Sequence, residues 1–436
     1  MALACAAMPS LGEDLIQVYR DAQRYDAQYA SARAALDAGR ESLPQGRALL
    51  LPTLGLTGNL TRQRINSDSQ DPVNSPQLSF LRYPRAYGYQ LTFTQPIFRP
   101  QNWLQYDESK YQVLQAEATF GQAGQDLILR VAQAYFDILA AQDTLNVVRA
   151  QKAAISEQLA QAKCNFEVGT ATITDTHEAQ ARSDLTRAQE IAAENDLATK
   201  RQALLAITGT EYKDLTPLRR DVKLSPPNPS DMQSWVDLAE KQSYAVLIQD
   251  ATTKIAELEV KRNNSAHLPT LDLVATHGQT NQTGTLTSAA GNDLTVTTIG
   301  FQVAMPLYQG GALTSRDRQA AALSVKAKDD MDNARRSSVL STRQSYLSVI
   351  NGIAQVGALE QAVVSSQSAL DSNKLGYEVG VRINIDVLNA QQQLFSTQRD
   401  LAVARYNTIT NHLRLKSAAG SLTEQDLQEV NGALQP

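Results

Sequence analysis

The sequence has few of the residues that would mark an enzyme, a metalloprotein or a nucleic-acid-binding protein. It holds four histidines and two cysteines, and no histidine lies at metal-ligand spacing with another histidine or a cysteine. The net charge of −5 offers no electrostatic basis for binding nucleic acid. Gly-x-Ser-x-Gly, P-loop and dinucleotide-binding motifs are missing. We therefore expect no catalytic residues, no metal and no cofactor, and we do not expect an enzyme.

Two further absences concern the backbone. No uncharged apolar run reaches the roughly 18 residues that a membrane-spanning helix needs, so a role in a membrane would have to use strands. No proline lies between Gln101 and Thr216, or between Leu307 and Gln435. Long continuous helices are therefore possible over both ranges.

The N-terminus resembles the end of a secretory signal peptide. Residues Ala2 to Ala7 are small and apolar, which predicts a signal remnant over residues 1–8 and export of the protein. A short, frayed alanine-rich terminus is the alternative. We do not expect Cys5 to be lipidated, and if it is removed with the signal, Cys164 is the one remaining thiol and no intrachain disulfide can form.

The two halves of the chain repeat each other. Leu51-Pro-Thr-Leu54 recurs as Leu268-Pro-Thr-Leu271, and a constant offset of 211 residues relates matched positions from Tyr135 to Gly209. The matched pairs are Tyr135 and Tyr346, Phe166-Glu-Val-Gly169 and Tyr377-Glu-Val-Gly380, Asp175 and Asp386, and Gly209 and Gly420. One offset held over so many positions predicts an internal duplication with two similar structural units.

The duplication predicts the domain organisation. Each repeat should contain a helix, then a strand pair, then two long helices joined by a Val-Gly turn. The boundaries are 9–209 for the first repeat (strands about 50–98, long helices about 101–208) and 231–420 for the second (strands about 268–308, long helices about 311–419). A proline-rich segment, 210–230, separates the repeats, and we expect it to pack outside the helices as an equatorial segment with the tail 421–436.

The predicted strands alternate between apolar and polar residues. Tyr87, Tyr89, Leu91 and Phe93 share one side of one strand, and Ile299, Phe301, Val303 and Met305 share one side of another. A period of two indicates one apolar and one polar face, and the lengths suit tilted membrane strands. The polar links 61–85 and 277–293 resemble extracellular loops. A soluble β-sandwich shows the same alternation and stays an alternative.

The predicted long helices carry a heptad seam. Apolar residues recur every seven positions from Tyr106 to Ile155, and Val349 to Tyr377 repeats the phase. A helix over 102–166 would be roughly 100 Å long, enough to cross a periplasm. The alternative is a coiled-coil structural or adhesive surface protein without a pore, which would leave the four alternating strands unexplained.

Four strands cannot close a barrel, and an open sheet would leave unpaired backbone groups in lipid. Three copies supply twelve strands, an even number in the range of outer-membrane barrels, whereas eight strands from a dimer would fill with side chains. We therefore predict a mixed α and β membrane protein. A water-filled conduit favours at least three protomers that share one barrel.

The residues that repeat at the turns resemble the TolC family of outer-membrane channel-tunnels. The resemblance covers nearly the whole chain, and its most specific parts are Phe166 to Asp175, Tyr377 to Ala390, Ala404 to Asn407 and Ile409 to Gly420. It implies a homotrimer in outer-membrane lipid, in which the three protomers share a 12-stranded β-barrel that is continued into the periplasm by a long α-helical barrel. The implied partners are a periplasmic adaptor (membrane fusion) protein and an inner-membrane ABC or proton-driven transporter. The exported substrates would be secreted proteins, small toxic compounds or both.

The resemblance also implies a gate at the periplasmic tip. Asp386 would form an acidic ring at the pore constriction that attracts and is blocked by cations, and Asn389 stands where the family has a second acidic residue. The closing links would join Tyr377 to Asp175 and Arg382 to the region of Thr174. Spacing alone favours simpler roles: Asp175 with Glu178 fits a capping box, Asp386 a charge at a helix start, and Arg382 a solvated turn residue.

Overall fold

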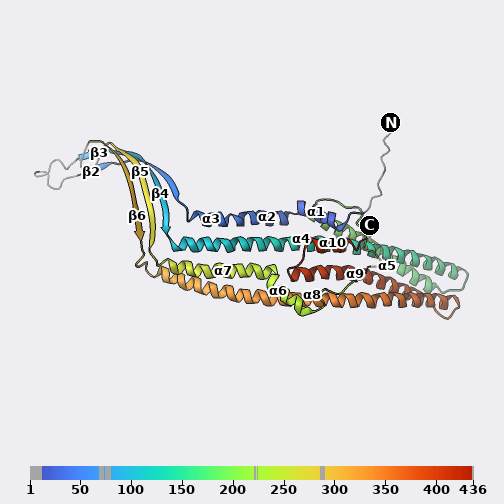
Figure 1. The fold of residues 1–436 in the computed structure, drawn as a ribbon. Coiled ribbons are helices and arrows are strands. Elements are labelled where there is room, and N and C mark those ends of the chain that lie inside the picture. The colour runs from blue at the N-terminus through green and yellow to red at the C-terminus, as the bar shows by residue number, and fades with distance from the viewer. Residues whose placement is uncertain are drawn as a thin grey trace, which may run out of the picture. The chain divides into compact units, whose positions relative to one another are not determined.

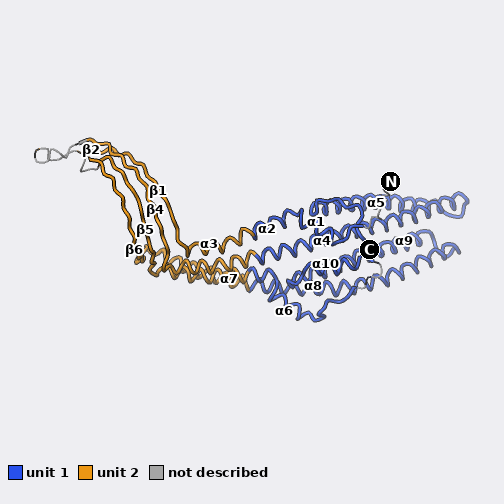
Figure 2. Tube along the Cα trace, turned by 45° about the horizontal axis from the view of Figure 1, so that its top comes forward, with its two compact units in different colours: residues 1–36, 117–248, 332–436 blue, residues 37–116, 249–331 orange. Residues whose placement is uncertain are grey.

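The structure is a computed structural model that describes residues 12–67, 73, 80–219, 222, 224–284 and 290–434. The chain forms two compact units (Figure 2). Unit 1 holds residues 1–36, 117–248 and 332–436, and unit 2 holds residues 37–116 and 249–331. Each unit therefore takes segments from both sequence repeats. The expectations for residues 1–8 and for Cys5 lie outside the described residues.

Unit 2 contains a four-stranded antiparallel sheet in the order β1-β4-β5-β6 (Figure 1). The strands are β1 (Thr53–Arg62), β4 (Arg85–Phe98), β5 (Thr270–Gln282) and β6 (Asn292–Ala304). All four predicted strands are confirmed. The repeats are joined by the pairing of β4 with β5, in which Leu91 lies opposite His277.

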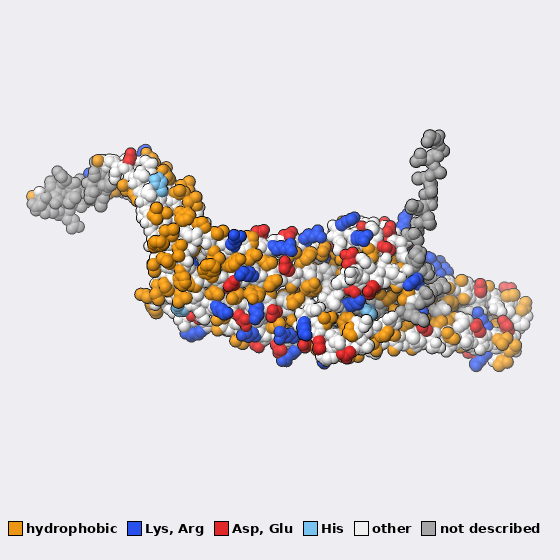
Figure 3. All heavy atoms as spheres, viewed as in Figure 1, with side chains coloured by type: hydrophobic (Ala, Val, Ile, Leu, Met, Phe, Trp, Pro, Cys, Tyr) orange, Lys and Arg blue, Asp and Glu red, His pale blue; other side chains and the backbone are white. Residues whose placement is uncertain are grey.

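Both faces of this sheet are largely exposed within one protomer. Every residue of β1 and of β6 is exposed, including Leu60 at 80% and Ile299 at 74%. Hydrophobic side chains gather over the strands (Figure 3). The two outer strands, β1 and β6, each have one partner strand among the described residues. An apolar sheet with two unpaired edges is incomplete as a soluble structure.

The link between β1 and β4 holds more structure than a loop. β2 (Ile65–Ser67) and β3 (Phe80–Arg82) pair as a short antiparallel ribbon. The link 61–85, which we expected to resemble an extracellular loop, therefore contains a short ribbon within it.

An ion pair holds the joint between strand and helix in unit 2. The Arg99 guanidinium donates through Nε and Nη2 to the two carboxylate oxygens of Asp272, at 2.7 and 2.5 Å. Asp272 is 5% exposed. The pair raises the pKa of Arg99, and the bidentate geometry fixes where β4 ends against the start of β5.

The remaining helices of unit 2 pack beside the first turns of the long helices. They are α3 (Ser42–Ala48), the last residues of α2 (Ala27–Arg40) and most of α7 (Tyr244–Ser265). Gly46 lies against Ser109, so close that a Cβ would meet the Ser109 hydroxyl at 2.4 Å. Glu108, 2% exposed, is paired with Arg262 at 3.3 Å, and burial raises its pKa.

Two very long helices follow the strand pairs, as predicted. They are α4 (Pro100–Glu167) and α8 (Ala312–Glu378), and each is followed by a shorter partner, α5 (Ile173–Thr208) or α9 (Asn384–Ala418). The helix predicted over residues 102–166 matches α4 within two residues at each end. The described helices include one 18-residue window apolar enough to cross a membrane, in α8, with a mean hydropathy of 1.3. Within the described residues, 11% of that window is buried.

The main hydrophobic core lies in unit 1. It packs α1 (Leu15–Tyr25) and α10 (Glu424–Asn431) with the middle of α4 and with parts of α5 and α9. Tyr135 is fully buried there, and the rings of Phe136 and Tyr406 stack with centroids 5.8 Å apart. The Tyr406 hydroxyl donates to Asp143 at 2.7 Å, and burial raises its pKa. Aromatic packing therefore joins helices from both repeats.

Segment 210–230 is held by equivalent tyrosines of the two repeats. The Tyr135 hydroxyl donates to the Thr216 carbonyl at 2.8 Å. The Tyr346 hydroxyl donates to the Ser230 carbonyl, just before α6 (Met232–Gln242). The segment also contacts the C-terminal tail, where Leu218 and Leu434 form an isolated antiparallel β-bridge. This contact agrees with the expected packing of segment and tail.

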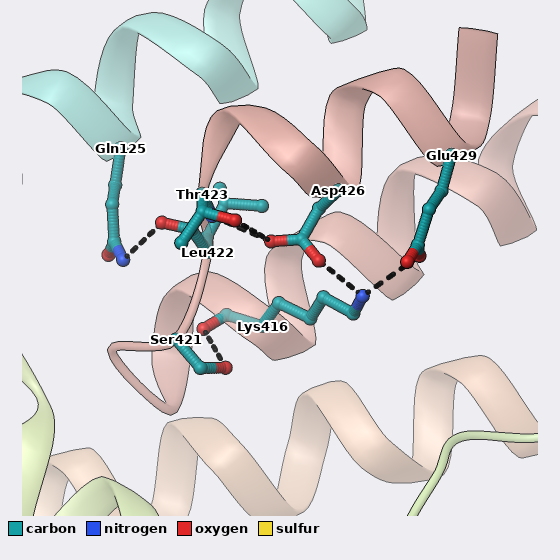
Figure 4. A network of polar contacts seen from close by, with 7 residues as sticks. All are labelled: Gln125, Lys416, Ser421, Leu422, Thr423, Asp426 and Glu429. Carbon is teal, nitrogen blue, oxygen red and sulfur yellow. Dashed lines mark hydrogen bonds and ion pairs between the residues drawn. The ribbon is translucent and has the colours of Figure 1, made fainter.

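A polar network fixes the tail against α9 (Figure 4). The Lys416 ammonium binds the carboxylates of Asp426 and Glu429. Asp426 also accepts from the Thr423 backbone N–H at 2.6 Å and so completes the capping box of α10. Gln125 of α4 donates to the Leu422 carbonyl at 3.0 Å. The tail is thereby bound to both long-helix pairs of unit 1.

Candidate functional site: the two hairpin tips

Each pair of long helices reverses direction at a Val-Gly turn. In the first tip, Gly169 has φ +79°, and the Thr170 N–H donates to the Asn165 carbonyl at 2.8 Å. In the second, Gly380 has φ +76°, and the Val381 N–H donates to the Gly376 carbonyl at 2.8 Å. A positive φ suits glycine, and the repeated sequence therefore makes the same turn twice.

The tips differ in how the next helix is capped. In α5 the Thr172 hydroxyl accepts from the Asp175 N–H, and the Asp175 carboxylate accepts from the Thr172 N–H at 2.9 Å. In α9 the matching N-cap is Ile383, which has no side chain able to cap. Asp386 therefore stands at the position of Asp175 without a capping partner, and it pairs instead with Arg382 at 3.6 Å.

The expected capping role of Asp175 needs one correction. We expected Asp175 to begin the helix and Glu178 to complete the box, but Asp175 is itself the third residue of the box that Thr172 begins. Helix α5 starts at Ile173, three residues earlier than an N-cap at Asp175 would require, because Thr172 supplies the capping hydroxyl.

The other predicted gate residues, Tyr377, Arg382 and Thr174, lie at the hairpin tips. Asn165 of α4 donates to the Tyr377 hydroxyl of α8 at 3.2 Å, which joins the two hairpins. Thr174 is exposed on the first turn of α5. Within the described residues of one protomer no contact joins Tyr377 to Asp175, or Arg382 to Thr174. Both links stay predictions about the assembled protein.

Asn389, the predicted second constriction position, has a partner that sequence reasoning missed. Arg182 of α5 donates through Nη2 to the Asn389 Oδ1 at 2.9 Å, and through Nη1 to the Gln392 side chain. The sequence pattern could not show which helix lies beside Arg182.

Two small apolar clusters pack the helices behind the turns. Ile155, Ala162, Ala179 and Leu388 join α4, α5 and α9, and Leu370, Val387 and Leu394 join α8 and α9. Two buried polar residues interrupt the seam of α9: Asn384 is 1% exposed and Gln391 is 2% exposed. The Asn384 Nδ2 and the Gln391 Oε1 have no hydrogen-bond partner in the described protomer. Polar groups of this kind weaken a coiled-coil seam while fixing its register.

The turns themselves present exposed apolar side chains. Val168 is 68% exposed, and Val379, Val381 and Ile383 are between 62% and 78% exposed. An exposed apolar patch at the end of a helical hairpin is typical of a surface that another protein covers. Among the described residues no group of three His, Cys, Asp or Glu side chains is placed to hold a metal ion.

A sheet with unpaired edges, duplicated long helices and paired turns define the chain as a protomer of an outer-membrane channel-tunnel. The chain belongs to the outer membrane efflux protein family, whose model matches residues 18–210 and 235–421. The two matched segments agree with the internal duplication.

Individual relatives are similar over nearly the whole chain. The outer membrane protein TolC of Vibrio cholerae is 35% identical over 97% of this chain and 94% of its own length. The proteases secretion protein PrtF of Dickeya chrysanthemi is 31% identical over 95% and 90%. The crystal structure of the Campylobacter jejuni CmeC outer membrane channel has the same fold, with a TM-score of 0.81 at 16% identity over 100% of this chain and 94% of that one.

Proposed function

We propose that the protein is the outer-membrane exit duct of a tripartite export system. It conducts substrates passively across the periplasm and the outer membrane, and it performs no catalysis. Its relatives include an outer membrane protein TolC and a protease secretion protein, so secreted proteins and small toxic compounds are both candidate substrates. No finding favours the alternative of an adhesive coiled-coil protein without a pore.

The unpaired edges of the sheet are the observation that carries this proposal. β1 and β6 expose apolar residues such as Leu56 and Phe301, at 71% and 72%, and their outer backbone groups need partners in lipid. The edge β1 of one protomer would pair with β6 of the next. Three protomers then close a barrel of twelve strands. The exposed apolar window of α8 would be covered in the same assembly.

In this proposal the protomer has the domains expected from the sequence. Residues 9–209 and 231–420 form the two repeats, and 210–230 with 421–436 form an equatorial belt around the trimer. The hairpin tips point into the periplasm. Their exposed apolar turns support docking of an adaptor protein and, through it, of an ABC or proton-driven transporter.

Assembly and conduction test the proposal together. We expect the purified protein to need detergent, to run as a trimer on SDS gels until heated, and to form pores in planar lipid bilayers. A soluble, elongated dimer without conductance would instead establish the coiled-coil alternative.

The constriction is proposed to lie at Asp386, with Asn389 one turn further along α9. Three copies of Asp386 would face one another and attract cations. Replacing Asp386 with Asn should reduce cation selectivity and block by divalent cations in bilayers. The Asp184→Asn variant is the matched control, because this exposed carboxylate of α5 accepts from Gln180 and is no part of the proposed constriction or links. Unchanged selectivity in Asp386→Asn would rule out this constriction.

The tip is proposed to be closed in the resting state by the links from Tyr377 to Asp175 and from Arg382 to the region of Thr174. The Arg382→Ser variant should then conduct more than the wild type in the closed state. It also removes the pair with Asp386, so cation selectivity should rise with conductance. Wild-type conductance in Arg382→Ser would show that Arg382 restrains nothing.

A further inference from the structure

We propose that Arg182 is a positioning residue of the gate. By binding Asn389 and Gln392, it holds α5 against α9, keeps the tip closed and places a positive charge beside the constriction. This inference rests on the proposed function, because it assumes that the tips close a pore. We call Arg182, Asn389 and Gln392 the Arg182 latch.

The geometry of the latch is that of a two-pronged clamp. One guanidinium reaches two amide oxygens on neighbouring turns of α9, the Asn389 Oδ1 at 2.9 Å and the Gln392 Oε1. The planar fork of arginine suits two acceptors at once, whereas lysine offers a single point charge. The latch therefore opposes sliding as well as separation of α5 and α9.

The latch shares a face of α9 with Asp386. Residues three apart on a helix are neighbours, so Asp386, Asn389 and Gln392 form one row. Arg382 stands at the start of this row, 3.6 Å from Asp386. Each protomer then brings two guanidinium groups and one carboxylate to the row. The expected acidic ring is consequently partly neutralised by residues of its own protomer.

The apolar packing behind the latch is too weak to make it redundant. Along the α9 seam, buried Val387 and Leu394 alternate with Asn384 and Gln391, and two buried polar atoms of these residues lack partners in the described protomer. An interrupted seam favours closure less than a continuous one. Polar contacts between the hairpins therefore contribute more to the equilibrium between closed and open states than they would beside a continuous apolar seam.

The size of the effect follows from having three latches. One exposed interaction of this kind changes an equilibrium constant by about two- to fivefold. If the three protomers open together, the closed-to-open equilibrium should shift by roughly ten- to a hundredfold when all three latches are lost.

Single-channel recording of full-length protein in planar bilayers, with KCl gradients, tests the latch. Arg182→Gln should raise closed-state conductance and cation selectivity. Arg182→Lys should raise conductance but keep the wild-type selectivity, because the charge stays and the fork is lost. Arg187→Gln, on an exposed residue of the same helix without a side-chain partner in the described part of the chain, should behave as the wild type.

Variants of the acceptor keep the test decisive if Arg182→Gln fails to assemble. Asn389→Ala should raise the closed-state conductance. Asn389→Asp should lower it, because the hydrogen bond from Arg182 becomes an ion pair. Asn389→Asp should also restore closure to Arg182→Lys, which a merely structural role of Arg182 would not predict.

The two proposals fail in different ways. If the wild-type protein forms no pores, the proposed function is wrong. If the wild type conducts but Arg182→Gln or Asn389→Ala matches it and Arg187→Gln in conductance, the latch is overturned while the export duct stands.

Discussion

The two hairpin tips are copies of one sequence element, yet their matched aspartates have different surroundings. Asp175 in the first tip accepts hydrogen bonds from both the backbone N–H and the hydroxyl of Thr172. Asp386 in the second tip follows Ile383, which caps nothing. One residue three positions before the aspartate thus decides whether the carboxylate closes a helix end or remains available to Arg382 and to ions.

The comparison shows how a duplicated fold can divide structural and functional roles. The first repeat keeps the stable cap, which is worth about 1 kcal/mol in a typical helix. The second repeat gives up that stability and gains a less constrained negative charge at the same place. A residue that breaks a local rule in only one of two repeats is a good candidate for a functional position.

The contacts of segment 210–230 show the opposite case, because the equivalent residues of the two repeats have kept one role there. Tyr135 and Tyr346 each donate a hydrogen bond to a carbonyl of segment 210–230. Tyr135 is fully buried and also donates to the Glu13 carbonyl at 3.2 Å, whereas Tyr346 is 9% exposed. The comparison can therefore be tested at positions where the repeats agree and where they differ.

The largest effect is expected for the tyrosines. Tyr135→Phe leaves the buried Thr216 carbonyl without this donor and should lower the free energy of unfolding by about 1–3 kcal/mol. Tyr346→Phe should cost less, about 1 kcal/mol, because its site is less deeply buried. Thermal unfolding of the helical circular-dichroism signal would measure both. An equal loss of unfolding free energy in the two variants would mean that the two tyrosine hydroxyls contribute equally to stability.

Exchanging the N-cap residues of α5 and α9 should change the stability of the two helix starts in opposite directions. We expect these changes to be smaller than the effect of Tyr135→Phe. Thr172→Ala removes a capping box and should destabilise the start of α5 by about 1 kcal/mol. Ile383→Thr should create the missing box, stabilise the start of α9 by up to about 1 kcal/mol and bind the Asp386 carboxylate. Hydrogen exchange at the two helix starts would measure the first change, and divalent-cation block the second. Ile383→Ala, which removes no cap, is the control and should leave hydrogen exchange nearly unchanged.

Sequence reasoning predicted the elements of the fold but not all of their partners. Alternation identified all four long strands, and heptads identified α4 and α8, because each periodicity reports which face of an element is buried. The pairing of β4 with β5 depends on which neighbour covers an edge, and no residue pattern encodes that choice. At the tips, Asp175 and Asp386 were found through the repeat. Arg182 was missed because a single surface arginine has no periodic signal.

The smallest effect concerns a titrating residue that only one repeat has. His412 lies at the position of Arg201, whose guanidinium donates to the Lys213 carbonyl at 3.0 Å. Burial, and then the charge of Lys416, lowers the pKa of His412 from 6.5, although Asp426 and Glu429 oppose the shift. Below about pH 6.5 the unfolded chain therefore binds a proton that the folded chain does not, and stability falls as the pH decreases from 7.5 to 5.5.

Thermal unfolding across this range should show that slope in the wild type and a smaller slope in His412→Gln. His177→Gln, at an exposed histidine of the first repeat, should keep the wild-type slope. If His412→Gln keeps the full slope instead, the pH dependence belongs to other groups, and the second repeat is no more sensitive to protons here than the first. If the slope is lost, the duplication has placed a permanently charged arginine in the first repeat and a histidine kept neutral by burial in the second.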